Sequence, residues 1–183
     1  MFSWFRKSPT EPLAVAMSGV KLADRLLVVG CSDPLLIATL AAKTGLTGRA
    51  CAVDRDEARA REAGRIAEIE GALVETAVWR GGRLPYPDDP FDVVVVRDPS
   101  SQAESDLSGS LHAVLDALRP GGRCVVIDGS RRRGLGGLRG GGGKRTPASD
   151  AITGAFRDAG FLAVRTLAER EGMVFVEGVK RNV

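Results

Sequence analysis

The sequence predicts an α/β fold, in which a doubly wound, mostly parallel sheet of seven strands ends in an antiparallel C-terminal hairpin. Two observations predict it. First, an apolar run at residues 26–29 stops at Gly30, and a second apolar run ends in the carboxylate of Asp54, 24 residues after that glycine. This order is typical of the first βαβ unit of a doubly wound sheet, where a nucleotide-like cofactor binds at the carboxyl ends of the strands. Second, strand-like and helix-like segments alternate through most of the remaining chain.

Local patterns set the individual elements. Residues 93–96 are four consecutive valines, which is typical of a strand buried on both faces. From Glu57 onward, alanines and isoleucines recur at helical spacing and form one apolar face. Only residues 169–172 separate the last two strands, so these form an antiparallel hairpin. The expected strands are 25–29, 50–53, 74–79, 91–96, 123–127, 161–168 and 173–179, the expected helices are 13–17, 34–44, 57–70, 104–118 and 149–159, and a turn is expected at 119–122.

Composition and charge are those of one globular domain. The chain has 183 residues, of which 44% are hydrophobic and 27% charged. Its net charge of +3 is too small to indicate nucleic-acid binding by itself. No apolar run approaches the roughly 20 residues that a membrane span needs. The three cysteines, at positions 31, 51 and 124, have neither metal-ligand spacing nor a disulfide pattern. We therefore expect no metal and a reducing, cytoplasmic location.

We divide the chain into an N-terminal leader with a short helix, residues 1–24, and one domain, residues 25–183. In the leader, Phe2, Trp4 and Phe5 precede a segment interrupted by prolines. These aromatic side chains suit packing against the flank of the domain, a lid over a substrate pocket, or a weak contact with a membrane surface. Packing is the interpretation we favour.

Within the domain, residues 129–148 are predicted to form a flexible basic loop. Seven of the ten residues from 134 to 143 are glycine, and arginines and lysines flank them. The loop is no phosphate-binding P-loop, because Lys144 is followed by arginine instead of serine or threonine. Two interpretations stay open, a solvated linker and a loop that closes on an anionic substrate or partner. RNA contact through its arginines is a weaker third.

Several local motifs, in the right order, resemble the class I S-adenosylmethionine-dependent methyltransferases, particularly the small-molecule group (methyltransferase type 11-like). The motifs are the glycine turn after the first strand, Leu-Pro-Tyr-Pro-Asp-Asp-Pro-Phe-Asp at 84–92, Leu-Arg-Pro-Gly-Gly at 118–122 and Asp-Ala-Gly-Phe at 158–161. The resemblance covers residues 20–180, and the family also inserts its last strand antiparallel. It implies a Rossmann-like methyltransferase fold, S-adenosylmethionine as cofactor and methyl transfer to a small molecule.

The resemblance places the first part of the cofactor site. The family's loop after the first strand lets the backbone approach the methionine and ribose portions, which implies contacts from Gly30, Cys31 and Ser32. This chain departs from the family pattern at three positions. Val28 stands where the family has an acid, and Ser32 and Pro34 replace its second and third glycines.

The second and third strands supply the other cofactor residues that the resemblance implies. Asp54 falls where the family's ribose-binding carboxylate lies, followed by Arg55, and Arg80 and Gly81 fall where the family approaches the adenine. A carboxylate there can accept hydrogen bonds from both ribose hydroxyls. As an alternative, Asp54 caps the following helix, although Asp56 is equally suited to that role. The alternative for Arg80 is a solvated loop arginine.

No catalytic residue is evident, and the weak candidate is Asp98. It follows the valine strand, where the family often places groups that contact substrate, so it can orient or deprotonate a nucleophile. Initiation of a turn with Pro99 is the alternative. His112 stands alone in a helix and is expected on its surface or packed. At the start of the first helix of the domain, Asp33 is expected to be the N-cap, which disfavours the pyrophosphate of NAD at that helix end.

Two functional hypotheses follow. The first is a cytoplasmic methyltransferase that transfers a methyl group from S-adenosylmethionine to an unidentified small molecule. Only some acceptors of such a transfer need a dedicated base. The second is a methyltransferase-like domain that has lost catalysis and serves as a binding or interaction module. The departures at Val28, Ser32, Pro34 and Arg80 favour the second hypothesis.

Overall fold

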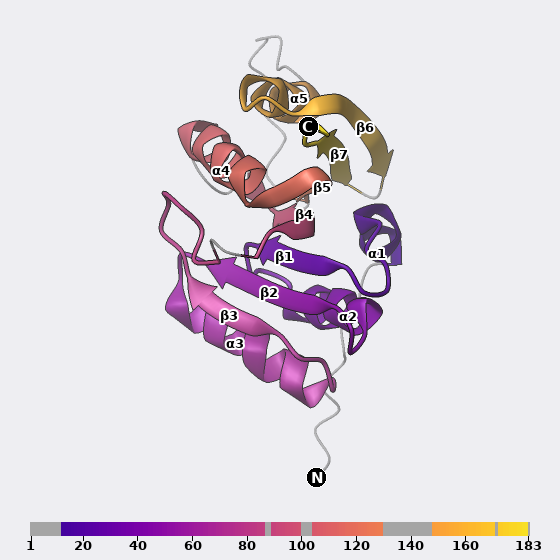
Figure 1. The fold of residues 1–183 in the computed structure, drawn as a ribbon, viewed down its shortest axis with the longest axis vertical. Coiled ribbons are helices and arrows are strands. Elements are labelled where there is room, and N and C mark those ends of the chain that lie inside the picture. The colour runs from indigo at the N-terminus through magenta and orange to yellow at the C-terminus, as the bar shows by residue number, and fades with distance from the viewer. Residues whose placement is uncertain (1–11, 87–88, 100–103, 130–147, 171, 183) are drawn as a thin grey trace, which may run out of the picture.

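The computed structural model describes residues 12–86, 89–99, 104–129, 148–170 and 172–182. These residues form a seven-stranded sheet with helices on both faces (Figure 1). Phe2, Trp4 and Phe5 of the leader and residues 130–147 of the basic loop lie outside the described residues.

The strand order is β3-β2-β1-β4-β5-β7-β6, in which β7 is antiparallel to both of its neighbours. The predicted fold class is therefore confirmed. The strands are β1 (Arg25–Val29), β2 (Arg49–Asp54), β3 (Glu75–Val78), β4 (Phe91–Arg97), β5 (Leu118–Asp128), β6 (Leu162–Arg170) and β7 (Met173–Val179), and the helices are α1 (Pro12–Ser18), α2 (Pro34–Thr44), α3 (Glu57–Ile69), α4 (Glu104–Ala117) and α5 (Ala148–Asp158).

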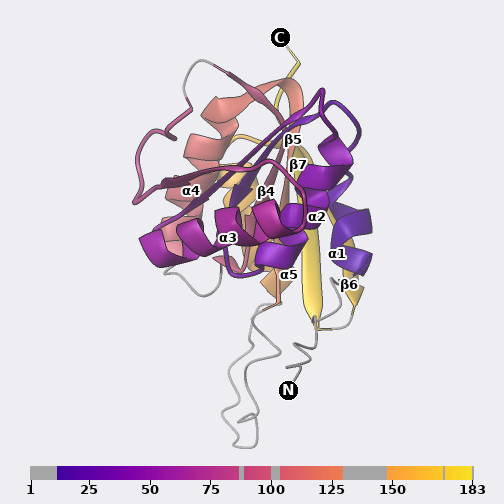
Figure 2. The same cartoon turned by 90° about the horizontal axis from the view of Figure 1, so that it is seen from below.

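The sheet separates two apolar layers, because side chains of a strand alternate between its faces. In β1, Leu26 and Val28 pack with residues of α1, α2 and α3, whereas Leu27 and Val29 pack with residues of α4 and α5. Figure 2 shows the sheet from a second direction, with helices on both sides. The central strands are buried on both faces, which explains why their sequences are continuously apolar.

The segment at 119–122 differs from the sequence-based expectation. It is part of β5, which begins at Leu118 instead of after the turn. The register passes from Phe91 opposite Leu118 to Val93 opposite Arg123, so the extra residues form a bulge in the strand. The backbone of this bulge stays hydrogen-bonded, since the N–H of Gly121 donates to Lys180 O at 3.2 Å. The residues at 119–122 do bend the backbone as the sequence predicts, but hydrogen bonds to the neighbouring segment at Lys180 keep them within β5.

Strand order reverses between β1 and β4, which lie side by side and parallel with Val29 opposite Val96. From β1 the chain proceeds outward to β2 and β3, and it then returns to the other side of β1. In open α/β sheets such a switch point leaves a crevice at the carboxyl ends of the two strands, where ligands bind. Here Gly30 follows β1 and Arg97 ends β4, and we use the word crevice for this region, where the topology leads us to expect a ligand.

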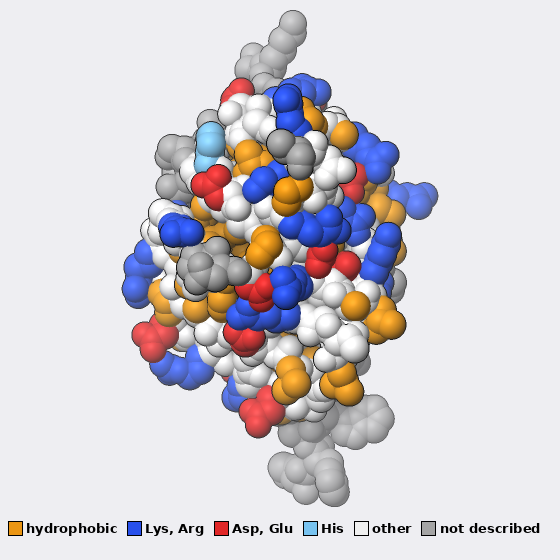
Figure 3. All heavy atoms as spheres, in the orientation of Figure 1, with side chains coloured by type: hydrophobic (Ala, Val, Ile, Leu, Met, Phe, Trp, Pro, Cys, Tyr) orange, Lys and Arg blue, Asp and Glu red, His pale blue; other side chains and the backbone are white. Residues whose placement is uncertain are grey.

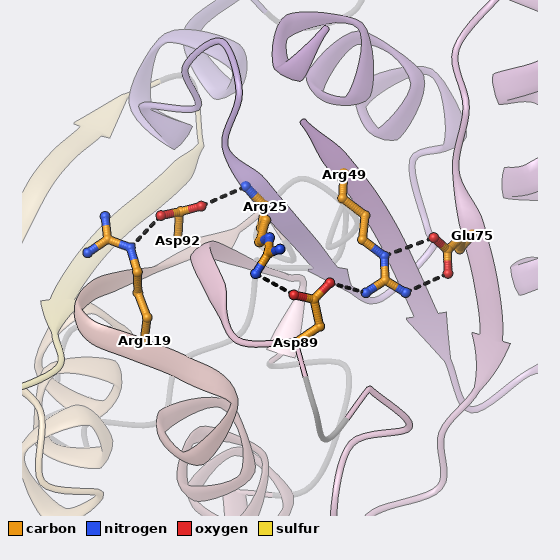
Figure 4. A network of polar contacts seen from close by, with 6 residues as sticks. All are labelled: Arg25, Arg49, Glu75, Asp89, Asp92 and Arg119. Atoms are coloured by element: carbon orange, nitrogen blue, oxygen red, sulfur yellow. Dashed lines mark hydrogen bonds and ion pairs between the residues drawn. The ribbon is translucent and has the colours of Figure 1, made fainter. Parts of the chain in front are cut away.

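The opposite edge of the sheet is joined by a network of ion pairs (Figure 4). Asp89, in the segment before β4, lies between the guanidinium groups of Arg25 and Arg49. Arg49 also donates two hydrogen bonds to Glu75, at 2.8 and 2.7 Å. The network consists of Arg25, Arg49, Glu75, Asp89, Asp92 and Arg119. It ties the amino ends of β1, β2, β3 and β4 together.

This arrangement gives the motif at 84–92 a structural role. The motif leads into β4. Its Asp89 pairs with the side chains of Arg25 and Arg49, and its Asp92 accepts from the backbone N–H of Arg25 at 2.8 Å. Tyr86 of the motif contacts the edge of the Phe91 ring, with a centroid separation of 6.0 Å. On the face drawn in Figure 3, basic and acidic side chains likewise lie next to each other, in keeping with the net charge of +3.

Replacing Asp89 with alanine leaves Arg25 and Arg49 facing each other without the carboxylate between them. We expect the free energy of unfolding to fall by about 1–2 kcal/mol at low salt. The difference from the original protein should shrink as salt is raised, because the pairs are partly exposed. Urea unfolding at two salt concentrations measures both effects. Glu62→Ala, which removes the exposed pair with Arg65, is the control and should lower the free energy of unfolding by less than Asp89→Ala does.

Candidate functional site

The turn after β1 fits only a glycine at its first position. Gly30 has φ +96°, and a Cβ built there would lie 2.8 Å from the carbonyl oxygen of Arg97 on the neighbouring strand. The N–H of Gly30 donates to Val53 O at 2.8 Å, which holds the turn against β2. Both the backbone conformation and the close approach of β4 therefore require the glycine.

The carboxylate of Asp54 ties this turn to the loop after β2. Its Oδ2 accepts from the N–H of Cys31 at 2.7 Å, and its Oδ1 accepts from the N–H of Asp56 at 2.8 Å. Arg59 of α3 approaches Oδ1 at 3.2 Å. The side chain of Asp54 is only 6% exposed, so these contacts offset the cost of burying its charge. The structure thus brings together three of the predicted site residues, Gly30, Cys31 and Asp54.

Asp54 is not the cap of α3. Asp56 has that role, because its carboxylate accepts from the N–H of Ala58 at 2.8 Å. Asp33 caps α2 in the same way, accepting from the N–H of Leu36 at 3.0 Å, with Pro34 as the first helical residue. The capping prediction for Asp33 is confirmed, and of the two candidates for the cap of α3 the structure has Asp56.

Asp98 connects the loops after three strands. Its Oδ2 accepts from the hydroxyl of Ser32 at 2.8 Å, and its Oδ1 accepts from the N–H of Gly129 at 2.9 Å. Its backbone has φ +49°, a conformation that aspartate tolerates better than most residues. Asp98 therefore connects the loops after β1, β4 and β5, and we call Asp98, Ser32 and Gly129 together the hub.

Sequence reasoning missed one residue of this site, Arg97. It ends β4, and its side chain is only 10% exposed. Its guanidinium lies among Asp33, Asp98 and Met173. The sequence carries only a weak signal for it, because the charged pair Arg97 and Asp98 follows the four valines and nothing local distinguishes the arginine.

The remaining predicted residues lie beside this group. Arg55 is half-buried directly after Asp54, and Arg80 and Gly81 follow β3, where Arg80 is exposed and Gly81 has open space around its Cα. Within the described ranges, Arg80 makes no hydrogen bond or ion pair with Gly30, Cys31 or Asp54.

Trp79, directly after β3, and His112 have structural roles. The indole of Trp79 is 5% exposed and donates to Gly82 O at 3.2 Å. His112 is exposed on α4, with Nδ1 2.8 Å from Ser108 O. In the described part of the chain, no group of three or more His, Cys, Asp or Glu could hold a metal ion. None of the described helices is long and apolar enough to cross a membrane.

The thiol of Cys31 is unsuited to nucleophilic chemistry. Burial, and secondarily the negative charge of Asp54, raises its pKa to about 12. Burial likewise raises the pKa of Cys51 to about 11. Both thiols therefore stay protonated near neutral pH, and the interaction of Cys31 with Asp54 is made by its backbone N–H.

A comparison with family profiles decides the assignment of the chain. A family described as a methyltransferase domain matches residues 26–122, more than half of the sequence. The chain belongs to this family. The match begins within β1 and ends in the bulge of β5, so it includes Gly30, Asp54 and Arg97. The resemblance predicted from the motifs is confirmed.

Among curated proteins, this methyltransferase-domain chain is similar to 2-phytyl-1,4-naphtoquinone methyltransferase of Synechococcus elongatus. The two are 32% identical over 120 residues, which are 63% of this chain and 50% of that protein. The same values hold for the protein of that description from a second Synechococcus strain. The chain thus spans about half the length of the curated relatives it matches.

Solved structures confirm the fold. A S-adenosylmethionine-dependent methyltransferase from Aquifex aeolicus superposes with a TM-score of 0.74 at 18% identity, covering 92% of this chain and 88% of that one. The cyclase SpnF superposes with a TM-score of 0.65 at 17% identity, covering 94% and 80%. At such identities the likeness shows the fold alone, and the fold accommodates more than one reaction.

Replacing Gly30 with alanine places a Cβ against Arg97 O in a left-handed backbone conformation. We expect a loss of roughly 2–4 kcal/mol in the free energy of unfolding. Gly109→Ala, in the middle of α4 with nothing within 4 Å of the added carbon, is the matched control. It should leave stability unchanged or raise it by up to about 1 kcal/mol. Equal effects of the two substitutions would contradict the geometry described for the turn.

The raised pKa values of Cys31 and Cys51 predict a dependence of stability on pH. Below the ordinary thiol pKa of 9.0, both the folded and the unfolded chain keep these protons. Between about pH 9 and pH 12 the unfolded chain releases them first, so the free energy of unfolding falls as pH rises. Urea unfolding from pH 7 to 10 measures this slope, which Cys31→Ala should reduce.

The same burial predicts slow chemical labelling. At pH 8 the folded protein should react with iodoacetamide at least about 100-fold more slowly than the urea-unfolded chain. Rapid labelling of folded protein at Cys31, located by mass spectrometry of peptides, would show that the thiol is accessible and ionised.

Proposed function

We propose that this chain binds S-adenosylmethionine at the carboxyl ends of β1, β2 and β4 and transfers its methyl group to a small molecule. One observation carries the proposal. In a chain of the methyltransferase-domain family, the carboxylate of Asp54 lies at the end of β2 and is hydrogen-bonded to the N–H of Cys31 in the glycine turn. This brings together the two elements that the family uses for ribose and methionine.

The contacts of Asp54 are compatible with a ribose. A carboxylate offers about four lone-pair positions, and the N–H groups of Cys31 and Asp56 occupy two of them. The third contact comes from Arg59, whose side chain is 54% exposed and can move into solvent. Two acceptor positions are then available for a diol. In this proposal Gly30 and Cys31 line the ribose with backbone.

Ser32, Arg55, Arg80 and Gly81 would complete the cofactor site. Ser32 is held beside the methionine end by its hydrogen bond to Asp98. Arg80 and Gly81 lie after β3, and the open space at Gly81 lets a flat ring approach the backbone. Arg55 follows the ribose-binding carboxylate.

Methyl transfer of this kind depends mainly on how the protein positions the acceptor relative to the cofactor. When bound, the cofactor supplies a methyl group on a sulfonium that an acceptor atom attacks in line. The chain would hold the acceptor in that line, and the hub at Asp98 is the part of the crevice best placed to do so. Both oxygens of Asp98 already accept hydrogen bonds, from Ser32 and Gly129, so its role is positioning.

For the acceptor, the similarity to the naphthoquinone methyltransferase favours a reduced quinone or a related aromatic compound as the first to test. The buried free thiols of Cys31, Cys51 and Cys124 support a cytoplasmic location as part of the same proposal.

A second function, a non-catalytic binding module, is favoured by one specific observation. Val28 occupies the position of the family's acid and is 1% exposed, packed among apolar side chains of the α1–α3 layer. A cofactor ammonium would then need its carboxylate from elsewhere in the crevice. The basic loop that would serve a module lies almost entirely outside the described residues.

Asp54→Asn removes the charge that would accept from the ribose while keeping the shape of the side chain. We expect the affinity for S-adenosylhomocysteine, measured by titration calorimetry, to fall roughly 10- to 100-fold. Asp116→Asn, on the exposed surface of α4, is the matched control and should bind as the original protein does.

The original protein should bind S-adenosylhomocysteine with a micromolar dissociation constant. Binding that is undetectable at millimolar ligand would reject the methyltransferase proposal and favour the module. Binding that survives Asp54→Asn unchanged would remove Asp54 from the site.

A further inference from the structure

The side chain of Arg97 is buried at the switch point without a well-formed hydrogen bond to any described residue. Its Nε lies 3.6 Å from Asp98 Oδ2 and its Nη2 lies 4.0 Å from Asp33 Oδ2. Both separations exceed hydrogen-bond length. Nη1 lies 3.9 Å from the sulfur of Met173, a weak acceptor. Nε is fully buried and lacks a hydrogen-bond partner among the described residues.

Such an arrangement is costly for the protein alone. A guanidinium carries five donors, and a buried donor without a partner loses its hydration without compensation. The two nearby carboxylates balance charge but do not repair this, because Asp98 Oδ2 at 3.6 Å and Asp33 Oδ2 at 4.0 Å are too far away for hydrogen bonds. An oxyanion bound at the carboxyl ends of β1 and β4 would supply the missing acceptors. Paired oxygens, as in a carboxylate, fit the fork of a guanidinium best.

The position of Arg97 indicates which part of the proposed cofactor would supply this carboxylate. Arg97 lies opposite the glycine turn, where a Cβ on Gly30 would be 2.8 Å from its carbonyl oxygen. In our proposed function this turn faces the methionine portion of the cofactor. That portion carries a carboxylate and an ammonium on one carbon. Here one cation, Arg97, lies within 4.0 Å of two anions, Asp33 and Asp98, so both groups find an opposite charge.

We propose that Arg97 binds the α-carboxylate of S-adenosylmethionine, and that Asp33 and Asp98 receive its ammonium in place of the acid that Val28 has displaced. The inference rests on the proposed function. Formal charge supports it, because Arg97 with two aspartates leaves one negative charge, and the cofactor, with a sulfonium, an ammonium and a carboxylate, brings one positive charge. The departure at Val28 is thereby compensated from β4 and the cap of α2.

Two ligands that differ only in the carboxylate test this inference. S-adenosylhomocysteine carries the group, and its decarboxylated analogue keeps the adenosine, the thioether and the amine. We expect Arg97→Met to lower the affinity for S-adenosylhomocysteine, measured by titration calorimetry, roughly 10- to 100-fold. The affinity of the same variant for the decarboxylated analogue should stay within about twofold of the original or rise, because the two aspartates then lack their cation and attract the amine.

Control variants separate binding from folding. Arg61→Met, at an arginine that is 74% exposed on α3, should change neither affinity. Thermal unfolding without ligand shows whether Arg97→Met is folded. If it is not folded, Arg97→Lys is used instead, because lysine keeps the charge without the two parallel donors of a guanidinium. It should lower the affinity for S-adenosylhomocysteine, and not that for the decarboxylated analogue, by roughly 3- to 10-fold.

The outcomes distinguish this inference from the proposed function. Equal weakening of both ligands, or no weakening, in a folded Arg97 variant overturns the role of Arg97 while the original protein's binding still supports a cofactor site. Absence of binding of either ligand to the original protein overturns both. Loss confined to S-adenosylhomocysteine supports the inference.

Discussion

The carboxyl edge of this domain depends on one hydrogen bond, from the N–H of Cys31 to Oδ2 of Asp54, at 2.7 Å. The chain must reverse direction after β1 within a few residues, and this bond fixes the second residue of the reversal to the adjacent strand. The carboxylate can be buried only because backbone N–H groups surround it. A buried charge of this kind is costly to leave unpaired, so the turn and the carboxylate hold each other in place.

The two edges of the sheet have different tasks. At the amino edge, acids and arginines pair at close range and join four strands, which serves stability. At the carboxyl edge, Asp54 and Asp98 accept short hydrogen bonds from backbone and hydroxyl groups, whereas among the described residues the guanidinium of Arg97 has only long contacts. Polar groups that a fold buries without satisfying them are concentrated where a ligand completes them. The contrast between the edges is therefore a physical argument for where the chemistry lies.

Much of the candidate site could be predicted from the sequence, because it follows directly from strand ends. Gly30 and Asp54 terminate apolar runs, and parallel strands place such ends at one edge. The caps at Asp33 and Asp56 were likewise predictable from local preference. Arg97 was not, because its importance comes from how completely its side chain is covered and from the distances to its acidic neighbours. Neither quantity is local in sequence. The same reason explains the segment 119–122, which forms a bulge within β5 because Leu118 already pairs with β4 and Gly121 is hydrogen-bonded to Lys180.

By itself the sequence determined the class of fold, the family, the order of elements and the two residues that mark the crevice, since hydrophobic periodicity and turn residues act over short stretches of chain. Only the tertiary structure decided which acids bind backbone, which acid connects three loops, and which arginine is buried without a full set of acceptors from the described residues. Those properties arise where β1, β2, β4 and β5 end side by side, and contacts between distant segments are set by packing of the whole sheet.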